Sequence, residues 1–223
     1  EKLAAIGRLA AGVAHELGTP LGVINGQAQR ALRHAPADGG TGKALMKIRR
    51  EVQRMDRIVR QLLDFGRRNP SCTRPEPVGR LVKSALIQVA EEARGTDVSL
   101  RVVTPGVGPT LPMDRPRLEQ ALTNLLRNAL HAAMGQVQVS WGIVGGWLEL
   151  RVDDDGQGID PAHRSRLFEP FFTTKSVGSG TGLGLSVAHG AVTEHQGEIQ
   201  VEDSPLGGAR LVIRLPLERI DAP

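Results

Sequence analysis

Two stretches before residue 69 carry apolar residues at alternating spacings of three and four, and this pattern constrains the fold more than any other. In the clearer stretch the apolar positions are Leu45, Ile48, Val52, Met55, Val59 and Leu62. A stripe sustained over more than two heptads is typical of an amphipathic helix that packs lengthwise against other helices. The earlier stretch has the same rhythm at Ile6, Ala10, Val13, Leu17 and Ile24. Because the connector "HAPADGG" contains a proline and paired glycines, the two helices are predicted to form an antiparallel hairpin.

A hairpin of two amphipathic helices cannot enclose a hydrophobic core by itself. Two hairpins that pair into a four-helix bundle bury both stripes. The sequence therefore predicts that residues 1–69 form a homodimer through such a bundle. The stretch "NPSCTRPEP", residues 69–77, contains three prolines and is predicted to be a linker.

Residues 77–223 are predicted to form a second domain, of mixed α/β class. The segments "QVQVSWGIV" and "WLELRVDD" are expected to form a hairpin around Gly145 and Gly146. Trp141 and Trp147 are expected to pack in the core or on a sheet face. Helices are expected over residues 78–94, 115–133 and 184–195, and strands over 98–103, 136–144, 147–154, 197–203 and 209–217.

Composition excludes several classes of function. Aromatic residues make up 3 % of the 223 residues, with no tyrosine, which disfavours a stacking platform for single-stranded nucleic acid. The net charge of +4 is spread along the chain, so a solvated surface is favoured over nucleic-acid binding. The single cysteine, Cys72, excludes an internal disulfide and fits a reducing compartment. No apolar run approaches the roughly 18 residues of a membrane span, so no membrane contact is expected. Because the chain begins at Glu1 directly in a helical pattern, we expect a fragment that lacks its N-terminal part.

The stretch "VAHELGTPLGVI", residues 13–24, places a histidine and a glutamate beside Pro20 and two glycines. Glycine and proline disfavour helix interiors most, so either the helix ends here or this segment serves a function. If the apolar stripe faces the core, His15 lies near the opposite side of the helix and faces solvent. Glu16 adjoins it, and Thr19 lies about one turn further on. A carboxylate beside an imidazole can hold one ring nitrogen as its N–H and leave the other as a nucleophile; an ordinary surface histidine is the alternative.

Two asparagines in the second domain are candidates for cation binding. Asn124 and Asn128 are four residues apart and therefore share one helix face. Amide oxygens suit a hard cation such as Mg²⁺, which usually keeps waters and phosphate oxygens as its other ligands. Ordinary surface asparagines are the alternative.

Two glycine-containing stretches are candidates for ligand binding. In "DDDGQGI", residues 153–159, the glycines allow close approach to a flat ligand, and a carboxylate at the strand end can accept a hydrogen bond from an exocyclic amine. A plain acidic turn or a calcium loop are the alternatives, although no glutamate follows at the spacing of an EF-hand. In "GSGTGLGLSVAHG", residues 178–190, the glycines lead into a helix whose first N–H groups can bind phosphate. Neither the P-loop nor the Rossmann fingerprint is matched there.

Taken together and in this order, the motifs resemble those of the catalytic core of the sensor histidine kinases. Residues 13–24 resemble the phosphoacceptor box, residues 118–133 the asparagine box, and "DDDGQGI" the first glycine box. "LFEPFFTTK", residues 167–175, resembles the phenylalanine box, and "GTGLGL", residues 180–185, the second glycine box. The resemblance covers nearly the whole chain. It implies an α plus α/β fold class: a helical hairpin that forms a dimeric four-helix bundle, followed by a GHKL-type (Bergerat) α/β sandwich that binds ATP.

The resemblance also implies roles for residues near the phosphoacceptor. His15 would accept the γ-phosphoryl group of ATP, and Glu16 would orient and activate its imidazole. Thr19 would help to place a water that dephosphorylates the response regulator. Pro20 would bend the helix just past the acceptor. The family often has a basic residue where this chain has Gly18.

In the second domain the resemblance implies an ATP site. Asn128 would bind Mg²⁺, Asn124 would lie close to the phosphates, and Asp154 would pair with the adenine amine. The other residues of the implied site are Gly156, Gly158, Lys175, Gly180, Thr181, Gly182, Leu183 and Gly184. Residues 173–179 would form a short lid over the nucleotide.

The implied partners are a second copy of the chain and the receiver domain of a cognate response regulator. The implied location is the cytoplasm, either alone or as the cytoplasmic part of a larger membrane-anchored sensor. One alternative is an ATPase of the same superfamily, such as the gyrase or Hsp90 class. Those enzymes carry a water-activating glutamate four residues before the position of Asn128, where this chain has Asn124, a poor base. The other alternative is an inactive dimerisation and docking module.

Overall fold

The computed structural model describes residues 20–33, 39–66, 73–104, 106–174 and 181–217, with the backbone alone for residues 53, 54 and 56–66. The chain divides into two compact units, Glu1–Asn69 and Pro70–Pro223. The segment with His15, Glu16 and Thr19 lies outside the described residues.

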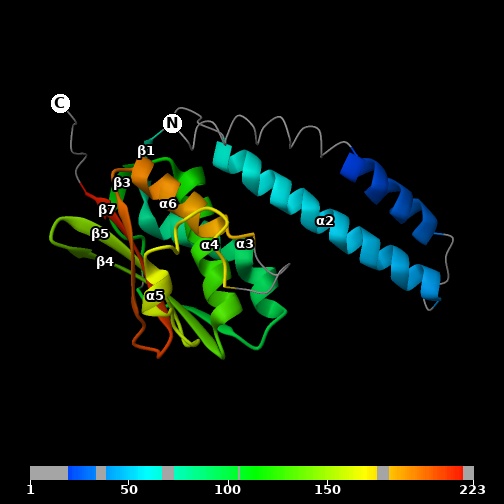
Figure 1. Cartoon of the computed structure of the whole chain (residues 1–223). Coiled ribbons are helices and arrows are strands. Elements are labelled where there is room, and N and C mark those ends of the chain that lie inside the picture. Colours follow the sequence, from blue (N-terminus) through cyan, green and yellow to red (C-terminus); the bar gives the residue numbers. More distant parts are fainter. Residues whose placement is uncertain (1–19, 34–38, 67–72, 105, 175–180, 218–223) are drawn as a thin grey trace. The chain divides into compact units, whose positions relative to one another are not determined.

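The first unit contains two antiparallel helices (Figure 1). One covers residues 20–32, and the other, α2, covers Gly40–Gly66. Along the predicted stripe of α2, Val52 is 4 % exposed, whereas Ile48 and Met55 are 45 % and 42 % exposed. Other exposed apolar side chains of this unit are Val23, Ile24 and Met46. The described helices therefore leave part of their apolar stripe uncovered, as the predicted pairing of two hairpins requires.

The second unit is an α/β sandwich built on a five-stranded sheet. The sheet has the order β2 (Ser99–Val102), β4 (Gln136–Val144), β5 (Trp147–Asp154), β7 (Ala209–Pro216) and β6 (Glu198–Asp203). The β2–β4 pair is parallel, and all other pairs are antiparallel. This arrangement confirms the predicted strands and the β4–β5 hairpin.

Three helices lie on one face of this sheet (Figure 1). They are α3 (Val78–Arg94), α4 (Arg115–Ala132) and α6 (Gly184–Glu194). In β5 the alternate residues Leu148, Leu150 and Val152 are buried against these helices, because successive side chains of a strand point to opposite faces. The core of the unit lies in this layer, and the predicted α plus α/β fold class is confirmed.

Three short elements were not predicted. Strand β1 (Arg74–Pro77) lies within the stretch that the prolines marked as a linker, and it pairs antiparallel with β3 (Thr110–Met113). Helix α5 (Pro161–Arg164) has four residues and is capped by the Asp160 side chain, which accepts a hydrogen bond from the N–H of Ala162. Because Arg74–Pro77 form strand β1, the prediction of a linker over residues 69–77 is wrong for its last four residues.

Helix α6 ends in a turn that places Gln196 in the left-handed region, with φ 58°. The N–H of Gln196 donates to the carbonyl of Thr193, and the N–H of Gly197 donates to that of Val192. These two bonds define a Schellman motif, in which the left-handed position is usually glycine. At the same end, Nε2 of His195 accepts the N–H of Asp114 at 2.9 Å, which links α6 to the start of α4.

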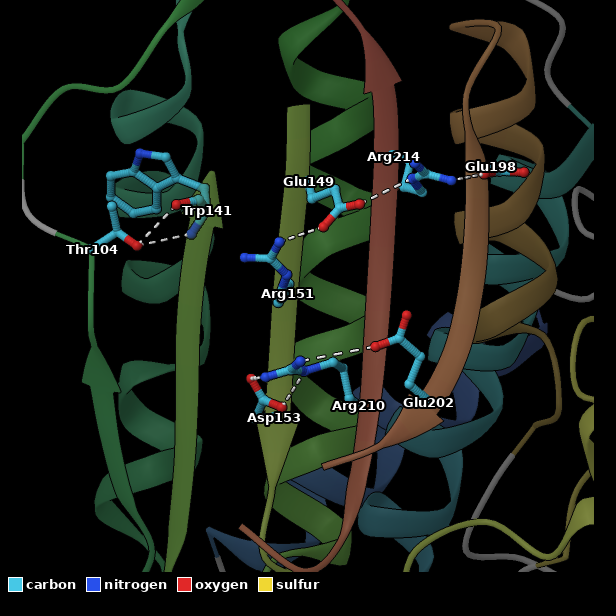
Figure 2. A network of polar contacts seen from close by, with 9 residues as sticks. All are labelled: Thr104, Trp141, Glu149, Arg151, Asp153, Glu198, Glu202, Arg210 and Arg214. Carbon is cyan, nitrogen blue, oxygen red and sulfur yellow. Dashed lines mark hydrogen bonds and ion pairs between the residues drawn. The ribbon is translucent and has the colours of Figure 1, made fainter. Parts of the chain in front are cut away.

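The outer face of the sheet carries a ladder of charged side chains (Figure 2). Arg214 on β7 lies between Glu149 on β5, at 3.1 Å, and Glu198 on β6, at 2.8 Å. Glu149 also pairs with Arg151 on its own strand. Beneath this ladder Val212 is buried, because the aliphatic parts of the long charged side chains cover it.

A single side chain continues the hydrogen bonding of β4 beyond the end of β2 (Figure 2). The Thr104 hydroxyl donates to the carbonyl of Trp141 and accepts its N–H, both at 3.0 Å. Trp141 itself packs in the core, and Trp147 lies on the outer face under the Arg214 guanidinium. Both tryptophans thus have the packing roles that were predicted for them.

Candidate nucleotide site

Asp154 ends β5, within the first glycine box, and is buried at 5 % exposure. Its Oδ1 accepts the N–H of Gly156 at 2.9 Å and the N–H of Ala209 at 3.1 Å. None of the described residues donates a hydrogen bond to its Oδ2. Burial raises the pKa of Asp154; the two backbone donors lower it in part, and the neighbouring carboxylates of Asp155 and Asp153 raise it further. The result is a buried carboxylate with one oxygen held and one oxygen left for a ligand.

The next residue, Asp155, faces the turn that follows α4. Its Oδ1 accepts the N–H groups of Met134 and Gly135 at 2.8 and 3.1 Å, and its Oδ2 accepts that of Gln136 at 3.0 Å. Desolvation favours the neutral carboxyl, but the backbone donors outweigh it and lower the pKa of Asp155. The carboxylate therefore joins the end of α4 and the start of β4 to the glycine loop.

Asp153, the residue before Asp154, is buried on the side of β5 opposite to the Asp154 side chain. Its carboxylate accepts hydrogen bonds from Arg210 at 2.7 and 3.3 Å and from the Ser204 hydroxyl at 3.2 Å. Arg210 also lies 3.8 Å from Glu202 (Figure 2). The three consecutive aspartates therefore have three different sets of partners, and of their oxygens only Oδ2 of Asp154 accepts no hydrogen bond from the described residues.

Two glycines allow the backbone to pack closely around Asp154. A Cβ on Gly156 would collide with the carbonyl of Ala132 at the end of α4. A Cβ on Gly208, in the turn before β7, would collide with the Asp154 carboxylate and the Gly156 nitrogen. Gly158, by contrast, is exposed at the loop tip. Any side chain at position 156 or 208 would therefore displace the segments that hold Asp154.

Asn124 and Asn128 lie on the helix that packs over the sheet beside this loop. Asn124 is buried, its Nδ2 donates to the carbonyl of Gly184 at 3.0 Å, and its Oδ1 accepts from Gln120 at 3.4 Å. Asn128, one turn further along, is half-buried. The buried amide thus has the partners that burial of a polar group demands, and it fixes α4 to the first residue of α6.

The second glycine box forms the entry to α6. The N–H of Leu183 donates to the Thr181 hydroxyl at 3.3 Å, and the Leu183 side chain is buried. Gly182 has φ 66°, and a Cβ there would collide with the backbone of Phe171. The N–H of Phe171 in turn donates to the carbonyl of Gly182 at 3.0 Å. The phenylalanine box and the second glycine box are therefore in direct backbone contact.

The structure places several of the predicted nucleotide residues in two contact groups. Asp154 and Gly156 meet the end of α4, and Asn124 meets Gly184 at the start of α6. Lys175 and Gly180 lie outside the described residues. Asp155, Gly208 and Ala209 were not predicted as site residues; the paired glycines of "SPLGGA" are the only signal that could have marked the turn before β7.

The described part of the chain contains no group of three or more His, Cys, Asp or Glu side chains that could hold a metal ion. A cation at this site would therefore depend on amide oxygens and on ligand oxygens, a donor set that suits Mg²⁺. A cavity of about 50 Å³ lies at the other end of α6, lined by residues that include His195 and Leu215. None of the predicted nucleotide residues lines that cavity.

Two family models match the chain. Residues 5–71 match the His Kinase A (phospho-acceptor) domain, and residues 113–219 match the histidine kinase-, DNA gyrase B-, and HSP90-like ATPase domain. No helix within the described ranges is long and apolar enough to cross a membrane.

Similar proteins align with nearly the whole chain. Sensor histidine kinase ZraS of Escherichia coli O157:H7 is 36 % identical over 219 residues, which cover 97 % of this chain and 47 % of ZraS. Sensor histidine kinase CpxA of Escherichia coli K12 is 37 % identical over 218 residues, covering 94 % of this chain and 47 % of CpxA. The crystal structure of full-length ShkA in complex with AMPPNP has a TM-score of 0.77 and 25 % identity, covering 96 % of this chain and 47 % of ShkA.

The chain spans about half the length of these relatives. A phosphoacceptor domain precedes an ATPase-type domain of the GHKL class, and the motifs of both stand in the order predicted from the sequence. The chain therefore belongs to the sensor histidine kinases, of which it forms the catalytic core.

Proposed function

We propose that this protein transfers the γ-phosphoryl group of ATP to His15 and then to an aspartate on the receiver domain of a response regulator. The observation that carries the proposal is the state of Asn124. Its amide donates to the Gly184 carbonyl at 3.0 Å, which a carboxylate cannot do. The position at which the related ATPases have a water-activating base is therefore occupied by a group that cannot take a proton. ATP bound here needs another nucleophile, and the phosphoacceptor domain supplies His15.

The adenine of ATP is proposed to be recognised by Asp154. Its Oδ1 is held by two backbone N–H groups, so Oδ2 can accept the exocyclic amine of the base. Gly156 and Gly158 form the loop beside the ring. The ionised form of Asp154 is required, because a protonated carboxyl would present a donor to a donor.

The phosphates are proposed to lie toward the start of α6. Backbone N–H groups at Gly182, Leu183 and Gly184 precede or begin this helix, where a phosphate is favoured. Gly180, Thr181 and Lys175 complete this part of the site in the proposal. The positive φ of Gly182 supports this placement. A left-handed residue in such a turn can direct successive backbone N–H groups toward one concave site, which favours an anion.

Mg²⁺ is proposed to bind Asn128. The half-buried side chain lies one turn from Asn124, and its amide oxygen fits a hard cation that takes its other ligands from phosphates and water. Bound Mg²⁺ would neutralise charge on the phosphates during transfer. Asn124 would hold α6 against α4 beside it.

At the phosphoacceptor, a ring nitrogen of His15 is proposed to attack the γ-phosphorus. An N–P bond forms, the bond to the ADP oxygen breaks, and Glu16 takes the proton from the other ring nitrogen. The N-linked phosphoryl group then passes to the receiver carboxylate. Thr19 is proposed to position a water in the reverse reaction, the dephosphorylation of the receiver.

The protein is proposed to act as a homodimer in the cytoplasm, where ATP and a receiver domain are available. The exposed Ile24, Ile48 and Met55 support the dimer, because a four-helix bundle would bury such a stripe. The greater length of ZraS and CpxA supports a larger sensor that contains this core.

Incubation with γ-labelled ATP and Mg²⁺ tests the reaction, using the His15→Gln variant and, as a matched control, His189→Gln on the exposed face of α6. Acid-labile, base-stable label is expected on the protein and on the control, and none on His15→Gln, whose ATP affinity should stay within a few-fold. Free phosphate without labelled protein would instead indicate an ATPase. The absence of both labelled protein and free phosphate would indicate a docking module. Label on His15→Gln at another histidine would overturn the assignment.

A further inference from the structure

Asp155 lies in the first glycine box, but its side chain binds the turn between α4 and β4. Its carboxylate accepts three successive backbone N–H groups, those of residues 134–136. These donors lie where α4 has ended and β4 begins. One half-exposed side chain thus accepts three backbone N–H groups at the junction between α4 and β4.

The same junction contains a second close contact. Gly156 packs so tightly on the carbonyl of Ala132 that no Cβ fits between them. Ala132 is the last residue of α4, and Asn128 lies one turn before it. Asp155 and Gly156 therefore fix the end of the asparagine-bearing helix to the loop that follows Asp154.

The position of Asp154 depends on that loop. Its Oδ1 is held by the N–H of Gly156, two residues further on, and by the N–H of Ala209. If the loop moves, the Gly156 donor moves with it, and the orientation of the carboxylate is no longer fixed. Both carboxylate oxygens of Asp155 already accept backbone N–H groups, so Asp155 can act on nucleotide binding through its neighbours.

We propose that Asp155 is a positioning residue for nucleotide recognition: it clamps the α4–β4 turn to the glycine loop and thereby orients Asp154 toward the adenine amine. This inference rests on the proposed role of Asp154. Its lowered pKa keeps Asp155 ionised, and therefore able to accept all three N–H groups, across the pH range in which Asp154 can still gain a proton.

The test is a double-mutant cycle on the whole chain, with variants Asp154→Asn, Asp155→Ala and the double variant. Dissociation constants for ATP and for inosine triphosphate, which lacks the exocyclic amine, are measured well below the unfolding temperature. Asp155→Ala should weaken ATP by about tenfold, the effect of one misaligned hydrogen bond, and inosine triphosphate much less. In the Asp154→Asn background the same change should have little further effect on ATP, because coupled residues are not additive.

Two further variants separate positioning from general stability. Asp155→Asn can keep one oxygen on the Met134 and Gly135 donors and should recover part of the ATP affinity. Asp160→Ala removes another aspartate that accepts a backbone N–H, that of Ala162 at 2.8 Å, and should leave both affinities unchanged.

Equal losses for the two nucleotides, additive effects in the cycle, or unchanged ATP affinity in Asp155→Ala would each overturn the positioning role. If Asp154→Asn itself fails to discriminate the nucleotides, the proposed adenine contact is wrong instead. The two failures are therefore distinguishable.

Discussion

Replacing Asp154 with asparagine should have opposite effects on the ligand-free domain and on ATP binding. The two side chains have the same shape, so Oδ1 can keep both backbone donors, at 2.9 and 3.1 Å. The change removes a charge that is 5 % exposed and lies beside two other carboxylates. Because burial raises the pKa of Asp154, the charged form costs the folded domain stability at neutral pH. The variant should therefore be at least as stable as the parent.

The expected cost appears only with nucleotide. In the proposed contact Oδ2 accepts the adenine amine, whereas the asparagine NH₂ would face it with donors. Losing that bond and leaving the donors unsatisfied should cost about 1–3 kcal/mol, or roughly ten- to a hundredfold in the dissociation constant for ATP. Inosine triphosphate has a carbonyl oxygen in place of the amine and can accept from the asparagine. Its affinity should stay constant or rise, so the ATP preference should shrink or reverse.

Isothermal titration with both nucleotides and thermal unfolding without ligand measure the two effects. The pH dependence has a defined sign. A raised pKa in the folded state favours the folded protein at low pH, and this contribution disappears as pH rises through that pKa. The stability advantage of the variant should therefore grow as the pH rises from below the ordinary aspartate pKa of 3.8 through the raised pKa of Asp154. Equal weakening of both nucleotides would refute the reading of the amine, and a less stable ligand-free variant would refute the argument from burial.

Other substitutions test three separate parts of the molecule. Asn128→Ala should remove Mg²⁺-dependent labelling of the protein while nucleotide binding without Mg²⁺ stays within a few-fold; retained labelling would contradict the metal assignment. Thr19→Ala should slow dephosphorylation of a phosphorylated receiver by roughly ten- to a hundredfold and leave autophosphorylation nearly intact. Glu16→Ala should instead reduce autophosphorylation most. If Thr19→Ala loses both activities, the catalytic role proposed for Thr19 is wrong. Gln196→Gly should relieve the left-handed residue at the end of α6 and raise the unfolding free energy by about 0.5–1 kcal/mol, or about 1–4 °C in the melting temperature of a domain this size. A Gln196→Ala control keeps the strain and should show no gain, so equal melting temperatures for the glycine and alanine variants would contradict the reasoning.

The long elements were predictable because each has a strong internal pattern. The alternation of Leu148, Leu150 and Val152 marks β5 as a half-buried strand, and the leucines of α4 mark its core face. Strand β1 was not predictable in this way. Its sequence "RPEP" contains two prolines, which lack the N–H of a ladder, and it survives only as the edge of a two-stranded sheet with β3.

The candidate site was predictable as a set of motifs but not as a set of contacts. The residues marked a carboxylate in "DDDGQGI" as a candidate, because a carboxylate followed by glycines is a local signal, and the family resemblance then assigned Asp154 among the three aspartates. The donor that holds it, Ala209, lies 55 residues away in a strand with no chemical signature. The role of Asp155 depends on a turn that only the folded sheet brings near. Motifs with a spacing rule were therefore found, and partners set by tertiary contact were not.

Thr104 protects the margin of the sheet from other molecules. Strand β4 extends beyond the end of its neighbour β2, and the exposed Ile143 and Val144 lie on this extension. Exposed apolar strand ends of this kind recruit strands from other chains. Because the Thr104 hydroxyl occupies both the N–H and the carbonyl of Trp141, an incoming strand finds only a few residues before the hairpin on which to register. The Thr104 hydroxyl thus shortens the unpaired backbone edge that β4 offers to another chain.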